Sequence, residues 1–326
     1  MSVIEVKDLS KVFRVKVKQK GFKEKLKHLF KSECKEKKAV NSISFSIEEG
    51  EAVAFIGPNG AGKSTTIKML TGILFPSSGE VRVLGLDPQK DRKKLTYEVG
   101  SVFGQKEQLW VHLTPYDNFK FFGAIYDIKK KELENRINEL SELFKIKSFI
   151  NQPVKSLSLG QRMKCEMVAS LLHNPKVLLF DEPTIGLDPI AKDTLRKLIK
   201  KINKELKTTI LFTSHDVGDI EEVCKRVIII NDGKIVMDDS MKNLKYHYMN
   251  KKIVQVKLKK DLKIDEREGL RVLKHKDSAY EIEVDMDKSS VEELLNLFKA
   301  DDLLDISISS TPLEEIIKEI YRSDDE

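Results

Sequence analysis

The residues of this chain best suited to chemistry form a glycine-rich loop that could bind phosphate groups. Residues 57–65 read Gly-Pro-Asn-Gly-Ala-Gly-Lys-Ser-Thr and match the pattern G-x-x-x-x-G-K-[ST] at each fixed position. Glycines let backbone N–H groups converge on phosphate oxygens, and a helix that starts at the loop adds its positive dipole end. Lys63 could reach the β- and γ-phosphates of a nucleotide, and the Ser64 hydroxyl is a typical Mg²⁺ ligand. This phosphate loop therefore predicts a site for a nucleotide and its magnesium ion.

The segments on either side of the phosphate loop are those that such a site requires. Residues 52–56 are all apolar and predict a buried parallel strand. Residues 63–74 predict a helix, because Ile67, Leu70 and Ile73 recur at helical spacing. Strand, loop and helix in this order distinguish a binding site from a chance glycine turn. The residues expected to contact the nucleotide here are Gly57, Asn59, Gly60, Ala61, Gly62, Lys63, Ser64 and Thr65.

A pair of carboxylates at the end of a second apolar stretch is the next candidate. Residues 177–180 read Val-Leu-Leu-Phe, and Asp181 and Glu182 follow directly. We expect Asp181 to hold Mg²⁺ through water, opposite Ser64. We expect Glu182 to act as the general base that polarises an attacking water. A strand that ends in Asp-Glu is a weak signal alone, but together with the phosphate loop it predicts nucleotide hydrolysis.

These segments together resemble the ATP-binding cassette (ABC) ATPases, and specifically the nucleotide-binding subunits of transporters. The resemblance covers about residues 2–240. Residues 157–162, Leu-Ser-Leu-Gly-Gln-Arg, resemble the signature segment, which in this family caps the ATP that a second subunit holds. It implies that Ser158, Gly160 and Gln161 belong to the nucleotide site. At Leu159 the family usually has glycine, which matters because leucine disfavours positive φ.

Ser158 also has a reading that needs no family, since it could simply cap a helix that starts near Gln161. Both readings can hold together, because a capped helix N-terminus directs its dipole at a phosphate.

The resemblance implies roles for four further residues. Gln105 would bind Mg²⁺ and the attacking water and would transmit the nucleotide state to a membrane partner. His215 would contact the γ-phosphate. Asp188, in the sequence Gly-Leu-Asp-Pro, would lie in the loop through which two cassettes sense each other. Phe13 is the candidate for stacking on the adenine base.

The order of the predicted elements indicates an α/β fold with a largely parallel sheet. The resemblance specifies a P-loop NTPase of the ABC cassette type over residues 1–240. It has a mixed sheet core, an antiparallel β subdomain and a helical insert at about 114–172. In that insert one helical face is apolar, formed by Leu133, Ile137, Leu140 and Phe144. Residues 241–326 predict a small α+β accessory or regulatory domain.

The positive charge of the chain is concentrated in an N-terminal insert at about residues 15–38. The chain has a net charge of +6, but residues 11–38 alone hold twelve Lys or Arg and three Glu. Within residues 21–31, apolar side chains recur at helical spacing among lysines. One reading is a basic amphipathic helix that contacts an anionic membrane face. The other is a solvated, charged loop, and the sequence leaves both open.

Composition excludes several classes of protein. No stretch approaches the roughly 20 apolar residues of a membrane-spanning helix, and the first residues lack the pattern of a signal peptide. Cys34, Cys165 and Cys224 are isolated, which indicates neither a metal site nor a disulfide framework. We therefore expect a cytoplasmic protein, peripheral on the inner face of the membrane through a permease.

The resemblance implies an ATP-hydrolysing subunit that powers a membrane transporter. Two cassettes, as a homodimer or a related heterodimer, would close on two MgATP and drive permease subunits carried on separate chains. Residues 103–110 and the basic insert resemble the export-type group related to sodium and drug exporters. The alternative is a soluble ABC ATPase that acts on nucleic acid or ribosomes. Such proteins usually carry paired cassettes, coiled-coil insertions or zinc modules. This sequence shows none of these features, so we expect no nucleic acid partner. A non-hydrolysing regulatory cassette is disfavoured by Glu182 and His215.

Overall fold

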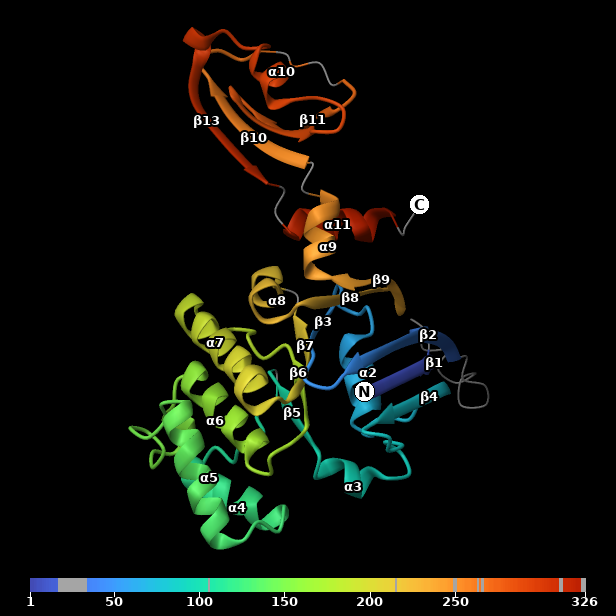
Figure 1. Cartoon of the computed structure of the whole chain (residues 1–326), viewed down its shortest axis with the longest axis vertical. Coiled ribbons are helices and arrows are strands. Elements are labelled where there is room, and N and C mark those ends of the chain that lie inside the picture. Colours follow the sequence, from blue (N-terminus) through green and yellow to red (C-terminus); the bar gives the residue numbers. More distant parts are fainter. Residues whose placement is uncertain are drawn as a thin grey trace, which may run out of the picture. The chain divides into compact units, whose positions relative to one another are not determined.

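The computed structural model describes two compact units, Met1–Asp238 and Asp239–Glu326. Both appear in Figure 1. The description covers the chain except residues 17–33, 105, 215, 249–250, 263, 265–266, 311–312 and 324–326.

The first unit is built on a six-stranded sheet with the strand order β5-β6-β7-β3-β8-β9. The five strands from β5 to β8 in this order pair in parallel, and four of them are buried along nearly their whole length. A parallel sheet covered on both faces needs such apolar strands. The strands are β3 (Ala52–Ile56), β5 (Val99–Phe103), β6 (Val177–Asp181), β7 (Thr209–Ser214), β8 (Arg226–Asn231) and β9 (Lys234–Ser240).

A separate antiparallel sheet has the order β2-β1-β4. Its strands are β1 (Ser2–Lys16), β2 (Cys34–Glu48) and β4 (Ser78–Val83). The mixed core and antiparallel subdomain predicted from the sequence are therefore both present.

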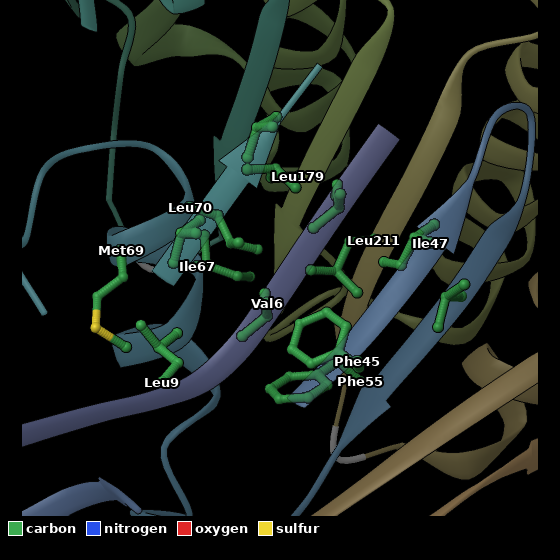
Figure 2. Packing of buried hydrophobic residues seen from close by; sticks show 14 of the residues in the cluster. Val6, Leu9, Phe45, Ile47, Phe55, Ile67, Met69, Leu70, Leu179 and Leu211 are labelled. Carbon is green, nitrogen blue, oxygen red and sulfur yellow. The ribbon is translucent and has the colours of Figure 1, made fainter. Parts of the chain in front are cut away.

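The main core of the first unit joins the two sheets through helix α2 (Lys63–Leu70). Figure 2 shows Ile67 and Leu70 of this helix near Val6 of β1 and Leu179 of β6. The rings of Phe45 of β2 and Phe55 of β3 pack with their centroids 5.7 Å apart and their planes tilted by 33°. Both the strand before the phosphate loop and the helix after it are thus fixed by apolar burial.

Helix α2 is shorter than the range 63–74 predicted from the sequence. Its C-cap is Thr71, and Gly72 takes a φ of 68°, which ends the helix in a left-handed turn. Ile73 is consequently 51% exposed and does not continue the buried face.

Three helices form a lobe beside the parallel sheet, at the lower left of Figure 1. They are α4 (Pro115–Ile125), α5 (Lys130–Leu143) and α6 (Leu159–Leu171). The apolar face predicted for the second of these helices is confirmed, because Leu133, Ile137, Leu140 and Phe144 are all buried. The remaining elements of the unit are α3 (Arg92–Thr96), α7 (Pro189–Leu206), α8 (Val217–Val223) and the 3₁₀ turn η1 (Val154–Ser156).

The second unit is an α+β domain with a four-stranded antiparallel sheet of order β11-β12-β10-β13. Its core lies where alternate side chains of the sheet, such as Val254, Val256 and Ile282, pack with Leu294 and Phe298. The elements are α9 (Met241–Tyr248), β10 (Lys251–Leu258), β11 (Leu270–Lys276), β12 (Ala279–Asp285), α10 (Val291–Leu295), η2 (Ala300–Asp302), β13 (Leu303–Ser310) and α11 (Leu313–Ser323). Among the helices described here, none combines the length and apolar character needed to cross a bilayer.

Candidate nucleotide site

The phosphate loop connects β3 to α2, and three of its glycines are required for different reasons. A Cβ atom on Gly57 would lie 2.3 Å from the Ile230 carbonyl oxygen. Gly60 has open space around it but a φ of 89°, which favours glycine. Gly62 has both constraints, with a φ of 114° and the Ala39 carbonyl oxygen 2.5 Å from an added Cβ. The loop conformation therefore depends on glycine at each of these positions.

Lys63, the first residue of α2, directs its ammonium group back over the loop. Its Nζ donates hydrogen bonds to the carbonyl oxygens of Gly57 at 2.7 Å and Pro58 at 3.2 Å. It also lies 3.6 Å from Oε1 of Glu182. Burial lowers the pKa of Lys63, while the negative charges of Glu182 and Asp181 oppose that shift. A buried positive charge thus lies between the phosphate loop and the carboxylates.

Ser64 and Asp181, which the sequence predicts to hold one magnesium ion, lie in direct contact. Ser64 Oγ donates a hydrogen bond of 2.9 Å to Asp181 Oδ1, and Thr213 Oγ1 donates another of 3.0 Å to the same oxygen. A hydroxyl beside a carboxylate is a donor set that suits Mg²⁺, which binds few protein oxygens and keeps several water or phosphate ligands. In the part of the chain described here there is no cluster of three or more His, Cys, Asp or Glu side chains placed to hold a metal. Ser64 and Asp181 therefore fit a magnesium ion by the chemistry of their oxygen atoms, and their role as metal ligands stays a prediction.

Glu182 has an unusual backbone conformation at the end of β6. Its φ is 53°, a left-handed value that is uncommon for a residue with a side chain. Its backbone N–H donates to both the carbonyl oxygen and Oγ1 of Thr213, at 3.2 and 3.0 Å. These bonds hold the strained residue in place, as is typical of functional sites. Glu182 is 8% exposed.

A cavity of about 260 Å³ opens beside these groups. Its lining brings together the end of β5, the start of α2 and both carboxylates, with the residues Ser64, Lys68, Ile73, Phe103, Lys106, Asp181 and Glu182. The hydroxyl, the carboxylates and two lysines thus border one space, where a water and a phosphate could meet.

The signature segment caps helix α6. Ser158 Oγ accepts from the N–H of Gln161 at 3.2 Å, and Gln161 Oε1 accepts from the N–H of Ser158 at 2.9 Å. This reciprocal pair is a capping box. Leu159 starts the helix and is not one of the positive-φ residues of the described structure. The missing glycine therefore causes no backbone strain here.

Asp188 likewise caps α7, because its Oδ1 accepts from the N–H groups of Ile190 and Ala191 at 3.0 and 2.9 Å. Phe13 lies exposed on β1, and the contact described for its ring is with Lys11, whose Nζ is 5.4 Å from the ring centroid. A role of either residue in nucleotide binding stays a prediction. Gln105, His215 and residues 17–33 of the basic insert, which include residues 21–31, lie outside the described residues.

The sequence analysis missed two residues that position the carboxylates. Thr213 bonds to both Asp181 and the backbone of Glu182. Gly104 donates its N–H to the Asp181 carbonyl oxygen at 2.9 Å, and an added Cβ would lie 2.0 Å from the Glu182 carbonyl oxygen. Gly104 directly precedes Gln105 in the sequence, but its contact with Glu182 depends on the pairing of β5 with β6.

The site combines a strand, a phosphate loop and a helix with two adjacent carboxylates, and the signature segment caps a helix of the neighbouring lobe. This combination defines a nucleotide-binding cassette. Comparisons agree with this class. The sequence model of the family described as ABC transporter matches residues 40–185. The ABC transporter ATP-binding protein NatA of Bacillus subtilis is 35% identical over 215 residues, which are 66% of this chain and 87% of the relative. The bacitracin transport ATP-binding protein BcrA of Bacillus licheniformis is 34% identical over 68% of this chain and 70% of its own length.

Solved structures give the same result. The ATP-binding cassette MJ0796, a dimer in a post-hydrolysis state with ADP and Pi, superposes with a TM-score of 0.61 at 25% identity. That match covers 73% of this chain and 98% of the cassette. CbiO1 of Clostridium perfringens, part of the transporter complex CbiONQ, gives a TM-score of 0.62 at 27% identity over 74% and 90%. The chain belongs to the ATP-binding proteins of ABC transporters, and it is an ATPase subunit of that family. The family predicted from the sequence is confirmed.

We expect Gly104→Ala to reduce ATP turnover at least about tenfold, because the new methyl group must displace the backbone of Glu182 and a misplacement of about 1 Å can cost 10²-fold. The measurement is steady-state ATP hydrolysis by the purified chain. Gly85→Ala is the control, since its Cβ would meet nothing within 4 Å although its φ is 75°. Equal turnover in the two variants would contradict this account of Gly104.

Proposed function

We propose that this chain hydrolyses MgATP at sites shared by two cassettes and thereby drives an export-type permease carried on separate chains. The observation that carries the proposal is the convergence of the phosphate loop with two carboxylates. Ser64 Oγ is 2.9 Å from Asp181 Oδ1, and Lys63 Nζ is 3.6 Å from Glu182 Oε1. Relatives described as bacitracin transport and linearmycin resistance ATP-binding proteins support the direction of transport.

In this proposal each residue of the site has one task. The N–H groups of the phosphate loop and the Lys63 ammonium bind and orient the β- and γ-phosphates. Ser64 and Asp181 would hold Mg²⁺, which neutralises phosphate charge when it is bound. Glu182 accepts a proton from the attacking water. Gln105 and His215 complete the set as the water-positioning and γ-phosphate-contacting residues.

The second cassette would contribute the signature to this site. Ser158 stands at the N-terminus of α6, where the helix dipole and free backbone N–H groups favour an anion. Ser158, Gly160 and Gln161 would thus cap the γ-phosphate held by the partner. The dimeric state of the similar cassette MJ0796 supports this arrangement. A soluble ABC ATPase on nucleic acid or ribosomes is the weaker alternative, since the relatives named above are transport proteins.

In this proposal a permease docks on two exposed aromatic side chains, one on α4 of the helical lobe and one on the segment just before α4. Trp110 and Phe121 are 51% and 39% exposed, and their ring centroids lie 3.9 Å apart. Asn118 fixes the Trp110 backbone, since its amide exchanges hydrogen bonds of 2.8 and 3.1 Å with the N–H and carbonyl of Trp110. Exposed aromatic side chains held in a fixed place are typical of binding surfaces. Through this contact the chain would lie at the inner face of the membrane. Direct contact of residues 21–31 with anionic lipid stays a prediction.

We expect Glu182→Gln to retain MgATP binding and to lower turnover by about 10²-fold or more, the usual worth of general base catalysis. The amide cannot accept the proton but leaves the phosphate loop intact. ATP hydrolysis and ATP affinity of the purified variant are the measurements. A turnover equal to that of the wild type would show that Glu182 is not the base.

We expect Ser158→Arg to abolish the ATP-dependent dimer while each monomer still binds ATP. The long cationic side chain would occupy the place of the partner's nucleotide. The test is size-exclusion chromatography with ATP in the Glu182→Gln background, where closed dimers should accumulate. A dimer that persists in the double variant would contradict the shared site.

Replacing Trp110 and Phe121 together by Ser should weaken binding to membrane vesicles that contain the partner permease, because the variant loses two large apolar contacts. Co-sedimentation measures the binding, and the thermal unfolding midpoint checks the fold. Phe75→Ser is the matched control, since Phe75 is another exposed aromatic residue of the same unit. Unchanged sedimentation of the double variant would place the docking surface elsewhere.

A further inference from the structure

Strand β13 forms one edge of the four-stranded sheet in the second unit, and among the described residues its one strand neighbour is β10. Figure 1 shows β13 along the outer side of that sheet. Three apolar side chains of β13 alternate with polar ones and are exposed. Leu304, Ile306 and Ile308 are 55%, 39% and 51% exposed. Such an edge presents unpaired backbone groups and apolar side chains to which another strand can bind.

The pairing of β13 with β10 determines the face of the sheet on which these side chains lie. Ile306 is level with Val256, and Ile308 is level with Val254. Residues directly opposite each other in an antiparallel pair lie on the same face. Val254 and Val256 belong to the buried core of this unit, whereas the two isoleucines lie outside it. The apolar face of the sheet therefore continues past its covered part and onto the edge.

The opposite edge of the same sheet has a different composition. Strand β11 carries two lysines, an arginine and a histidine among its seven residues. Charged side chains on an edge strand disfavour pairing with another chain. Strand β13 has a single charged residue, Asp305, which is level with Lys257 of β10. One edge of the sheet is thus protected by charge, and the other can accept a strand.

The sequence of β13 is complementary to itself. In an antiparallel pair of two β13 strands with a two-fold axis at Ile306, the two Ile306 side chains meet, and Ile308 of each copy meets Leu304 of the other. Asp305 then lies opposite Ser307, so the two like charges do not face each other. Each exposed apolar side chain of the edge finds an apolar partner. A two-fold axis is also the commonest symmetry of protein dimers.

We propose that two copies of this chain associate through β13, which joins their four-stranded sheets into one continuous antiparallel sheet. One pair of eight-residue strands is small beside the roughly 1,200 Å² that a stable interface buries. The contact is therefore weak and dissociates on dilution, as in size-exclusion chromatography. It becomes significant where two copies are already held together, because its effective concentration then reaches the mM range. Its use in a transporter rests on the proposed function, whereas the pairing itself needs no nucleotide.

The test is disulfide formation by Ile306→Cys in the concentrated full chain without ATP. The two introduced thiols would lie on directly opposite residues, whose Cα atoms are about 4.5–5.5 Å apart, within the reach of a disulfide. Ile308→Cys is the matched control. Ile308 is the more exposed residue, but its two copies would be roughly 13 Å apart along the strands, at 3.3 Å per residue. We expect at least about fivefold more crosslinked dimer from Ile306→Cys than from Ile308→Cys or the wild type, whose own cysteines give the background.

Sedimentation equilibrium measures the association without a crosslink. Ile308→Lys should weaken it at least about tenfold, because the charge would be buried without a partner against Leu304 of the other copy. Met286→Lys is the matched control, since Met286 is an exposed apolar residue of the same unit outside β13. This control should leave the association unchanged.

The outcomes separate this inference from the proposed function. Equal crosslinking at positions 306 and 308, or none above the wild type, would overturn the pairing. The introduced thiol of Ile306→Cys should also crosslink when Ser158→Arg is present. A crosslink lost in that double variant would mean that the copies meet through their cassettes alone, and the inference would be wrong. If Glu182→Gln forms no ATP dimer while the crosslink persists, the shared nucleotide site fails and the β13 pairing stands.

A different occupant of the edge would give a different pattern. If the chain shows no self-association, but Ile308→Lys weakens its binding to vesicles that contain the permease and Met286→Lys does not, the strand binds the permease. The pairing of two copies would then be wrong.

Discussion

The parallel pairing of β6 with β7 is the constraint on which the rest of the site depends. It places Asp181 level with Thr213, and pairing of β7 with β3 places Thr213 level with Phe55, at the strand that leads into the phosphate loop. A shift of one residue in either pairing would turn the side chains to the opposite face of the sheet. The 2.9 Å contact between Ser64 and Asp181 is therefore a product of strand register, which the buried apolar side chains of these strands hold.

Thr213 is the residue through which this strand register fixes the positions of the carboxylates. Its hydroxyl donates to the side chain of Asp181 and accepts from the backbone N–H of Glu182, so one side chain orients both carboxylates. The left-handed backbone at Glu182 is unfavourable by itself, and such strain persists only where surrounding bonds determine the conformation. The strained backbone at the end of β6 is thus held in place by the hydrogen bonds from Thr213 of β7.

The site patterns that can be recognised from the sequence are those that are local in the chain. The phosphate loop, the Asp181–Glu182 pair and the Ser158 cap each occupy a few consecutive residues, so their patterns were visible without the fold. Thr213 and Gly104 could not be found in this way, because their importance depends on which strands become neighbours. The end of α2 was placed too late, since the helical spacing continues to Ile73 although Gly72 takes a left-handed conformation. A Cβ atom added to Gly72 would lie 2.2 Å from the Pro88 carbonyl oxygen.

The ammonium group of Lys63, which bonds to the loop itself, influences which ligands the loop can bind. Its hydrogen bonds to Gly57 and Pro58, and the nearby Glu182 carboxylate, already satisfy much of its need for partners. A ligand must offer more negative charge than this internal set before the lysine exchanges one for the other. A nucleoside without phosphates offers nothing in exchange, and a polyphosphate offers several anionic oxygens. Discrimination by charge thus begins at the loop itself, before any contact with the base contributes.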